Sequence, residues 1–593
     1  MKIRDKIKAL YKGELKERLK RLLGKKLGFI KKRFEIADGL NFEFNCSFID
    51  SKRTIFLEEF ENNKNIEQVI LMNKLINIYN FENYYEKKFF NIPWYKIKIS
   101  EYKKDVRLFW EINRLQFLPL FTLNLIINNK DEKLIEFLKN WEKYNPYNYG
   151  LNWVSNLEIA IRSISILLAY IIYLLKNNRN AYIEELLFKH AFHIYKDIKY
   201  TEKCIPNNHL IGEAVALYIF GNIFRSKYSK KWVSKSKNIL KKYIEHIKTD
   251  GTYEEASLSY HRFVIQMFLL YYYFSKIFKD DFLWDKIEDR LEKSYIFFKK
   301  IEKPNGTYPQ FGDWDDGVYF KLNNERIENF GYFVNTLGYI CSYNNRKNLE
   351  IMILEMLFEN IKIKNNEKTK LNLEKAFDIF DQGKYGVCKD KNKYVFINNQ
   401  NQVFHSHSDG LSIELSLNSK DLLVDSGTYS YNLDRNLREY FRSTRAHNTV
   451  YLGFDQSTQV GSFRWIDQPK TILRKTDKGF SGEILYRNGS RHFREVVIED
   501  EKIVIKDVVS NKKRKFIEIN YHFHPDRNIK IVDDSTIIVD DQFVLKIKSN
   551  KKYHLKITES LYSKSYLKLT KRQNLKIIFN ENKIKCETVF QYT

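Results

Sequence analysis

The segment NLEIAIRSISILLAYIIYLL, residues 156–175, predicts the architecture of a large part of this chain. Its apolar residues recur three and four positions apart, which is the spacing of one face of an α-helix. The same spacing returns in HRFVIQMFLLYYYFSKIF (261–278), and polar breaks such as NNRN and KPNG separate such segments from about 60 to 365. Many successive helices of this length favour helical hairpins packed side by side. No strict period supports a simple repeat array.

The character of the sequence changes near residue 380, where short segments rich in β-branched residues begin. These segments are KYVFINN (393–399), LSIELSLN (411–418), DLLVDSG (421–427), KIVIKDVV (502–509), TIIVDD (536–541) and FVLKIKS (543–549). Several alternate apolar with polar residues, and turns rich in Asp, Asn and Gly separate them, so an antiparallel β-sandwich is expected. We therefore predict three parts: a basic helical segment (1–40), a helical domain (41–370) and a β domain (371–593).

The first 40 residues, beginning MKIRDKIKALYKGELKERLKRLLGKK, read as a basic amphipathic helix. The favoured interpretation is a solvated helix packed on the main body, and contact with a membrane surface or a nascent glycan is the alternative. The stretch lacks the apolar centre and small-residue cleavage site of a secretory signal. A cytoplasmic location is therefore expected, or a periplasmic or secreted one if the chain is a processed form.

The chain of 593 residues has a net charge of +27, with 43% hydrophobic and 30% charged residues. Such an excess attracts polyanions, and nucleic acid, anionic membrane and acidic polysaccharide all fit. A lysine-biased proteome is the alternative explanation. The 5 cysteines are scattered and form no CxxC pair, which argues against a disulfide framework and a thiolate zinc site.

The most apolar run, Ile164 to Leu175, is bounded by Arg162 and Lys176. It is shorter than the roughly 20 residues that span a bilayer. We therefore expect a buried core helix and no transmembrane segment.

Three of the 12 histidines lie in one window that contains FHSHSD (404–409), VDSG (424–427) and RAHNT (445–449). If 404–409 is a strand, His405 and His407 project from the same face. The side chains of His407, Asp425 and His447 could converge on a metal, and two imidazoles with one carboxylate suit Zn²⁺. A hydrogen-bonded His/Asp cluster inside a sandwich core is the alternative.

Two further groups carry polar side chains able to hold a carboxylate or move a proton. PNNHLIGE (206–213) opens a helix, and DGTYEEASLSYHRF (250–263) joins one helix to the next. YNLDRNLREYFRSTR (431–445) contains four arginines that could bind carboxylate or sulfate through hydrogen bonds. Core packing, helix capping and internal ion pairs with Asp434 and Glu439 are the alternatives. No Walker loop, dinucleotide fingerprint, GxSxG elbow or zinc finger is present.

As a set, these motifs resemble the heparinase II/III superfamily of polysaccharide lyases. The most similar segments are HSHSDGLSIELSLNSKDLLVDSGTYSYN (405–432) and FRSTRAHNTVYL (441–452). The helical half adds, in the family's order, VRLFWEINRLQFL (106–118), GLNWVSNLEIAIR (150–162), NNHLIGEA (207–214), DGTYEEASLSYHRF (250–263) and FGDWDDG (311–317). The resemblance covers roughly residue 100 to the C-terminus and is specific to the superfamily, but poorly specific to substrate.

The resemblance implies an α+β multidomain chain: an (α/α) toroid, often incomplete, then an antiparallel β-sandwich, with an acidic polysaccharide in the cleft between them. It implies β-elimination by Asn208, Tyr260 and His405, and a structural zinc held by His407, Asp425 and His447. Further residues are expected to contact the glycan: His209, Glu255, His261, Arg262, Arg438, Arg442 and Arg445. A monomer or homodimer is expected.

The implied chemistry is removal of the C5 proton of a uronate and loss of the glycosidic oxygen at C4, which leaves a 4,5-unsaturated uronate. Hydrogen bonds from Asn208 to the carboxylate would stabilise the developing charge. Tyr260 or His405 would take the proton, and a tyrosine can protonate the leaving oxygen. A tyrosine base needs a depressed pKa, which Arg262 is expected to supply. Which of the two residues is the base stays open.

Two other functions compete with a lyase. A non-catalytic glycan-binding protein, or a capsule or exopolysaccharide assembly protein, on the same fold would suit the basic N-terminus and the missing signal. A nucleic-acid binder is suggested by charge alone, and no recognisable reading motif supports it. We therefore expect no nucleic-acid partner.

Overall fold

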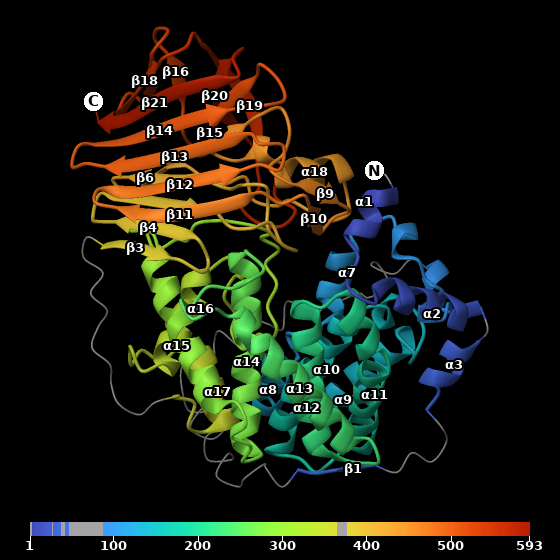
Figure 1. Ribbon diagram of the computed structural model, residues 1–593. Helices are drawn as coiled ribbons and strands as arrows, with labels where there is room; N and C mark the ends of the chain where they lie inside the picture. The colour runs from blue at the N-terminus through green and yellow to red at the C-terminus, as the bar shows by residue number, and fades with distance from the viewer. Residues whose placement is uncertain (1–2, 27, 37–41, 47–86, 364–375, 593) are drawn as a thin grey trace.

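The computed structural model describes residues 3–26, 28–36, 42–46, 87–363 and 376–592. Its N-terminal part is helical and its C-terminal part is built of antiparallel strands (Figure 1), which confirms the predicted order of helices and strands. The toroid itself stays a prediction. The predicted domain boundaries at 40/41 and 370/371, and the helical pattern expected from 60 to 86, lie outside the described residues.

The helical half contains inner helices that are apolar on all sides and outer helices that bury one face. α10 and α12 are buried along almost their whole length, whereas α9 buries only Leu134, Leu138 and Trp141. A helix that is apolar all round belongs in a core. The main helices are α7 (Val106–Asn113), α8 (Leu118–Ile127), α9 (Glu132–Tyr144), α10 (Asn156–Leu174), α11 (Ala181–Cys204), α12 (Asn208–Ile223), α13 (Ser229–Tyr243), α14 (Leu258–Ile277), α15 (Trp284–Ile301), α16 (Phe330–Ile340) and α17 (Leu349–Phe358).

By length and composition alone α10 could cross a membrane, since its mean hydropathy is 1.9. However, 94% of this window is buried inside the protein. The neighbours α8, α11 and α12 pack against it. It is therefore the core helix that the sequence predicted.

Three antiparallel sheets make up most of the β half. An eight-stranded sheet has the order β11-β12-β13-β14-β21-β18-β17-β16, a four-stranded sheet β19-β20-β15-β8, and a five-stranded sheet β3-β4-β5-β6-β7. The strands are β3 (Ala376–Phe380), β4 (Tyr385–Lys389), β5 (Lys393–Asn398), β6 (Ile413–Leu417), β7 (Lys420–Leu423), β8 (Val450–Tyr451), β11 (Lys470–Thr476), β12 (Gly479–Leu485), β13 (Arg491–Ile498), β14 (Lys502–Ser510), β15 (Ile517–His522), β16 (Ile529–Ile531), β17 (Thr536–Val539), β18 (Phe543–Ser549), β19 (His554–Tyr562), β20 (Thr570–Phe579) and β21 (Lys583–Tyr592).

The five-stranded sheet lies between the helices and the rest of the β half (Figure 1). Successive side chains of a strand point to opposite faces. In β5, Tyr394 and Phe396 join the core shared with the helices, whereas Val395 and Ile397 join the core of the β half. A strand buried on both faces reads as continuously apolar instead of alternating. This sheet therefore joins the two halves through two hydrophobic cores.

The segment 404–409 is a turn and loop, so the condition under which His405 and His407 would project from one face of a strand is not met. The loop 311–317 of the helical half presses against it. The backbone N–H of Asp313 donates to the carbonyl of His405 at 2.6 Å. Gly312 has φ +63, and a Cβ there would lie 2.7 Å from that carbonyl. Only glycine accepts this conformation and this close approach without strain.

The N-terminal segment forms three helices, α1 (Ile3–Lys8), α2 (Glu14–Lys26) and α3 (Phe29–Phe34), instead of one. α2 and α3 pack on α11. The buried carboxylate of Glu14 accepts hydrogen bonds from Arg464 of the β half at 2.8 and 3.0 Å. The described part of the segment therefore packs on the main body, in contact with both halves.

Candidate functional site

A cleft of about 540 Å³ lies where the two halves meet. The helical half lines it with residues from α7, α10, the start of α12 and the start of α14, and the β half lines it with residues 404–405, 431–432 and 460–464. α2 adds the side chain of Arg18. Asn208, Tyr260 and His405 all face this one cavity.

Asn208 is the first residue of α12, and its neighbour Asn207 caps the helix. The side chain of Asn208 is fully buried, and Glu255 holds it in place. The carboxylate of Glu255 accepts from the backbone N–H and from Nδ2 of Asn208, both at 2.8 Å. Nδ2 also lies 3.4 Å from Nε2 of His405. The amide is thus fixed at the point where the helical half meets the β half.

His405 lies between two carboxylates of the helical half. Its Nδ1 is 3.0 Å from Oδ2 of Asp313, and its Nε2 is 3.5 Å from Oε2 of Glu255. The ring stacks on Tyr260 with centroids 3.5 Å apart and planes 11° apart. Asp313 can therefore orient the imidazole through Nδ1 and leave Nε2 facing the cleft.

Asp313 is fully buried and also accepts from Nε2 of His407 at 3.1 Å and from Nη2 of Arg438 at 2.8 Å. Burial alone would raise the pKa of Asp313. Arg438 and the hydrogen bonds from His405 and His407 outweigh it and hold this pKa well below the usual range. The side chain is therefore an anion that links three basic side chains of the β half to the helical half.

The hydroxyl of Tyr260 donates to Oδ2 of Asp315 at 2.9 Å and lies 3.2 Å from the hydroxyl of Tyr431. Burial, followed by the negative charges of Asp315 and Asp313, raises the pKa of Tyr260 well above its usual value. The side chain is therefore protonated before substrate binds. Nε of Arg107 binds the same carboxylate oxygen of Asp315 at 3.3 Å.

The expectation that Arg262 depresses the pKa of Tyr260 is wrong. The guanidinium of Arg262 donates to the carbonyls of Ile327 at 2.7 Å and Gly317 at 3.3 Å. It lines a separate small hollow and not the cleft. His261 is also buried away from the cleft, with Nε2 3.1 Å from the hydroxyl of Ser294. Successive residues of a helix point in different directions, so Tyr260 reaches the cavity whereas His261 and Arg262 do not.

The other predicted glycan contacts divide into two groups. His209 lines the cleft, and burial lowers its pKa to about 4, so its imidazole is neutral near pH 7. Arg438 and Arg442 are buried, the first on Asp313 and the second on the carbonyl of Gly461 at 3.0 Å. Arg445 is exposed and lines a different surface hollow. The structure therefore does not bring these three arginines into the cleft.

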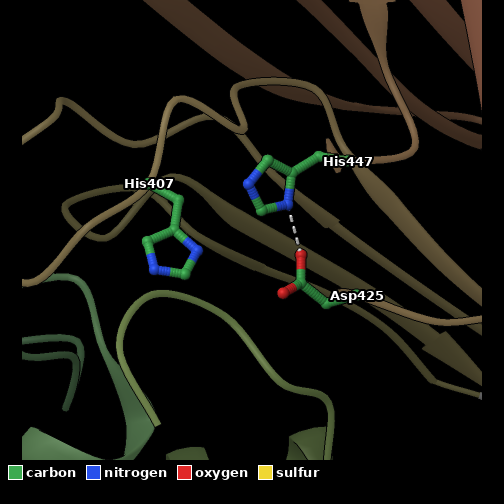
Figure 2. A group of neighbouring side chains, drawn as sticks. All are labelled: His407, Asp425 and His447. Atoms are coloured by element: carbon green, nitrogen blue, oxygen red, sulfur yellow. Dashed lines mark hydrogen bonds and ion pairs between the residues drawn. The ribbon is translucent and has the colours of Figure 1, made fainter. Parts of the chain in front are cut away.

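His407, Asp425 and His447 form a buried cluster with ligand atoms that all lie within 4.8 Å of one another. Figure 2 shows the three side chains turned toward a common centre. Nδ1 of His447 is 2.6 Å from Oδ2 of Asp425. Within the described part of the chain, Nδ1 of His407 and Nε2 of His447 are buried without a hydrogen-bond partner. Two unpartnered imidazole nitrogens beside a carboxylate fit the donor set that Zn²⁺ prefers.

Several residues of the cleft were not singled out from the sequence. Asp313 and Asp315 lie in FGDWDDG, a motif quoted for the resemblance without any role for its carboxylates, and Tyr431 ends VDSGTYSY. A cluster of three aspartates around a tryptophan was the available signal. Arg18 and Arg464 could not be singled out from the sequence, because single basic residues are common in a chain with 101 lysines and arginines.

Comparison with known sequences gives two family matches that agree with this architecture. The family described as Heparinase II/III N-terminus matches residues 25–333, and Heparinase II/III-like, C-terminal matches residues 374–593. A heparin-sulfate lyase of Bacteroides stercoris is 24% identical over 348 residues, which are 56% of this chain and 47% of that protein. The matched region thus spans about half the length of this curated relative.

Solved structures share the fold. A crystal structure of heparinase III superposes with a TM-score of 0.60 at 18% identity, covering 85% of this chain and 79% of that one. A heparan sulfate lyase mutant from Pedobacter heparinus gives a TM-score of 0.56 at 18% identity, covering 86% and 79%. The two family matches together cover most of the sequence, and the chain therefore belongs to the heparinase II/III family.

Proposed function

We propose that this protein is a polysaccharide lyase that cleaves an acidic, uronate-containing glycan by β-elimination. The observation that carries the proposal is the meeting of Asn208, Tyr260 and His405 in one cleft, with His405 stacked on Tyr260 and within 3.4 Å of Asn208. The three side chains are close enough to act on one sugar ring. Family membership and the relative's name, heparin-sulfate lyase, support a glycosaminoglycan as substrate, and an acidic bacterial exopolysaccharide is the second candidate.

The electrostatics of the cleft suit an acidic glycan. Its walls carry four arginines and two carboxylates: Arg18, Arg107, Arg114 and Arg464 against Glu158 and Asp315. Guanidinium groups bind carboxylate and sulfate with paired hydrogen bonds. Internal carboxylates hold these arginines in place, as Glu158 holds Arg114 at 2.7 and 3.0 Å. A polyanion would therefore meet cations that are already oriented.

In the proposed reaction His405 is the base and Tyr260 is the acid. Asp313 orients His405, and Nε2 takes the C5 proton. The electron pair left on C5 forms the C4–C5 double bond as the bond from C4 to the glycosidic oxygen breaks. Tyr260, which its raised pKa keeps protonated, gives its proton to that oxygen. The amide of Asn208 donates to the uronate carboxylate, where negative charge develops.

Incubation with heparan sulfate, chondroitin sulfate, hyaluronan and alginate tests this function, since each cleavage creates an unsaturated uronate that absorbs ultraviolet light. We expect absorbance to rise on at least one uronate polymer. If no uronate polymer, including the capsule of the source organism, gives a rise while binding is retained, the alternative of a non-catalytic glycan-binding or assembly protein holds.

Replacing Asn208 by alanine is expected to lower kcat by roughly 10² to 10³, as for loss of one donor at a developing oxyanion. KM should change much less, because the lost interaction strengthens as charge develops. Asn156 offers a matched control, since its buried amide donates to Glu213 at 2.7 Å and does not line the cleft. If Asn208→Ala and Asn156→Ala lower kcat equally, Asn208 has only a structural role.

We also propose that His407, Asp425 and His447 hold a structural Zn²⁺ that would tie the loops 404–409 and 445–449 to the end of β7. Metal analysis of purified protein should give close to one zinc per chain, falling to background in His447→Ala. His492→Ala is the control, because His492 is an equally buried histidine paired with Asp507 at 2.7 Å. Retention of zinc by His447→Ala, or its loss from both variants, would contradict the assignment.

A further inference from the structure

The outward face of α2 is apolar, although this helix lies on the surface of the protein. The side chains of Leu15, Leu19, Leu22 and Leu23 are between 50% and 57% exposed. Positions three, four, seven and eight apart share one face of a helix. Phe29, at the start of α3, is 64% exposed. We call these five side chains the leucine stripe.

The inward face of α2 is charged. Glu14 is fully buried against Arg464, and Arg21 donates to Asp197 at 3.1 Å and lies 3.8 Å over the ring of Tyr200. A surface helix normally turns its apolar side to the core and its charges to water. Here buried polar contacts anchor the helix with the opposite orientation. The leucine stripe is therefore held outward by specific contacts and not by fraying.

Cations surround the leucine stripe. Lys16, Lys20 and Lys26 lie one helical turn from its leucines, and Lys12 lies in the turn before α2. Over the described residues 5–26 and 28–36, Glu35 is the exposed acidic side chain. The exposed basic side chains of these same residues are Lys6, Lys8, Lys12, Lys16, Arg18, Lys20, Lys26, Lys31, Lys32 and Arg33. The surface is thus apolar along its centre and positive around it.

We infer that α2 and α3 dock this protein on the surface of an anionic lipid membrane. The leucine stripe would enter the boundary between headgroups and acyl chains, and the lysines would lie at the level of the phosphates. An acidic glycan would neutralise the lysines but leave the leucines in water. A second copy would cover the leucines but bring two positive surfaces together. An anionic bilayer satisfies both kinds of side chain at once.

Docking would also position the cleft. Arg18 lies on α2 and lines the cleft, and Tyr11, just before α2, packs on Phe404 with ring centroids 5.8 Å apart. Because the same helix contributes to the membrane-facing surface and to the cleft, the cleft would open close to the bilayer. Glycans presented at a membrane would then be the accessible ones, a consequence that rests on the proposed function.

Co-sedimentation of the full chain with vesicles tests the inference. Vesicles of phosphatidylcholine with phosphatidylglycerol should bind the protein, and vesicles of phosphatidylcholine alone should bind it at least severalfold more weakly. Lys16→Glu with Lys20→Glu should weaken binding at least roughly thirtyfold, since loss of two lysines costs about 1 kcal/mol each and the glutamates add repulsion from the anionic lipid. Leu19→Ser with Leu22→Ser and Leu23→Ser should weaken it roughly tenfold or more, since apolar burial is lost.

Matched variants on the β half control for general loss of charge or apolar surface. Lys551→Glu with Lys552→Glu changes two exposed lysines of the loop between β18 and β19, and Val532→Ser with Leu569→Ser changes two side chains that are 52% and 42% exposed. Both control pairs should bind vesicles as the wild type does. All variants change exposed residues, so their melting temperatures should match the wild type.

Four results would overturn the inference. The first two are failure of the wild type to bind anionic vesicles, and binding to neutral vesicles as strong as to anionic ones. The third is a loss of binding in the control variants equal to that in the α2 variants. The fourth is a dimer, detected by light scattering, that the leucine substitutions dissociate. The last result would assign the leucine stripe to contact between two copies. Lyase activity on a soluble polymer is measured in parallel. Unchanged activity in the leucine variants separates failure of docking from failure of the proposed reaction.

Discussion

Replacing Tyr260 by phenylalanine is expected to lower kcat on a susceptible uronate polymer by roughly 10³, within the range for loss of a general acid. His405→Ala should lower it by a similar factor, because the proposed base is lost. Tyr260→Phe leaves Asp315 and Tyr431 in place around the missing hydroxyl. Initial rates of absorbance increase measure the effect, and glycan affinity measured by calorimetry should change little.

Tyr319→Phe is the matched control for Tyr260→Phe. Its hydroxyl is buried, donates to the carbonyl of Gly212 at 2.7 Å and does not line the cleft. We expect full activity in this variant. If Tyr260→Phe and His405→Ala both keep wild-type rates, the assignment of acid and base is wrong. If the wild type binds the glycan and never shortens it, the protein is a binding module on a lyase fold.

Replacing Asp313 by alanine is expected to lower the free energy of unfolding by about 3–5 kcal/mol, as for other broken buried ion pairs. Arg438 would remain buried without its carboxylate, and His405 and His407 would each lose a partner. Denaturant titration measures the loss of stability. Activity should fall as well at temperatures where the variant is folded, because His405 is no longer oriented.

Asp507 is the matched control for Asp313. It is buried in the β half and accepts from one arginine and one histidine, Arg494 at 2.8 and 3.0 Å and His492 at 2.7 Å. Asp507→Ala should therefore be similarly destabilised, yet keep kcat/KM when folded. Equal retention of kcat/KM in both variants would show that Asp313 contributes only to stability.

The elements of the fold could be predicted from the sequence because their periodicity is local. The segment 543–549 is a strand with the predicted bounds, and 156–175 is a core helix that ends one residue earlier. The conformation of 404–409 was harder to predict, because two histidines separated by one residue suit a strand and a turn equally. Its conformation is fixed by the loop 311–317, which lies almost a hundred residues earlier in the chain.

The candidate site was predictable only as far as its residues resemble the family. Asn208, Tyr260 and His405 were expected in one cleft and lie together. Arg438 was expected to contact the glycan, but it is buried on Asp313 and does not line the cleft. Sequence reports which side chains carry charge, whereas their partners depend on contacts between distant segments. For the same reason Asp313 itself escaped notice.

The contact between Asp313 and the histidine loop also has a consequence for biosynthesis. The helical half is synthesised first. Asp313, in its loop 311–317, then has none of its basic partners, which lie at residues 405, 407 and 438. Domains generally fold as units during translation, starting with the earlier one. The acidic loop would therefore stay without its partners until the last third of the chain has been synthesised, so the cleft can be completed only after the β half has folded.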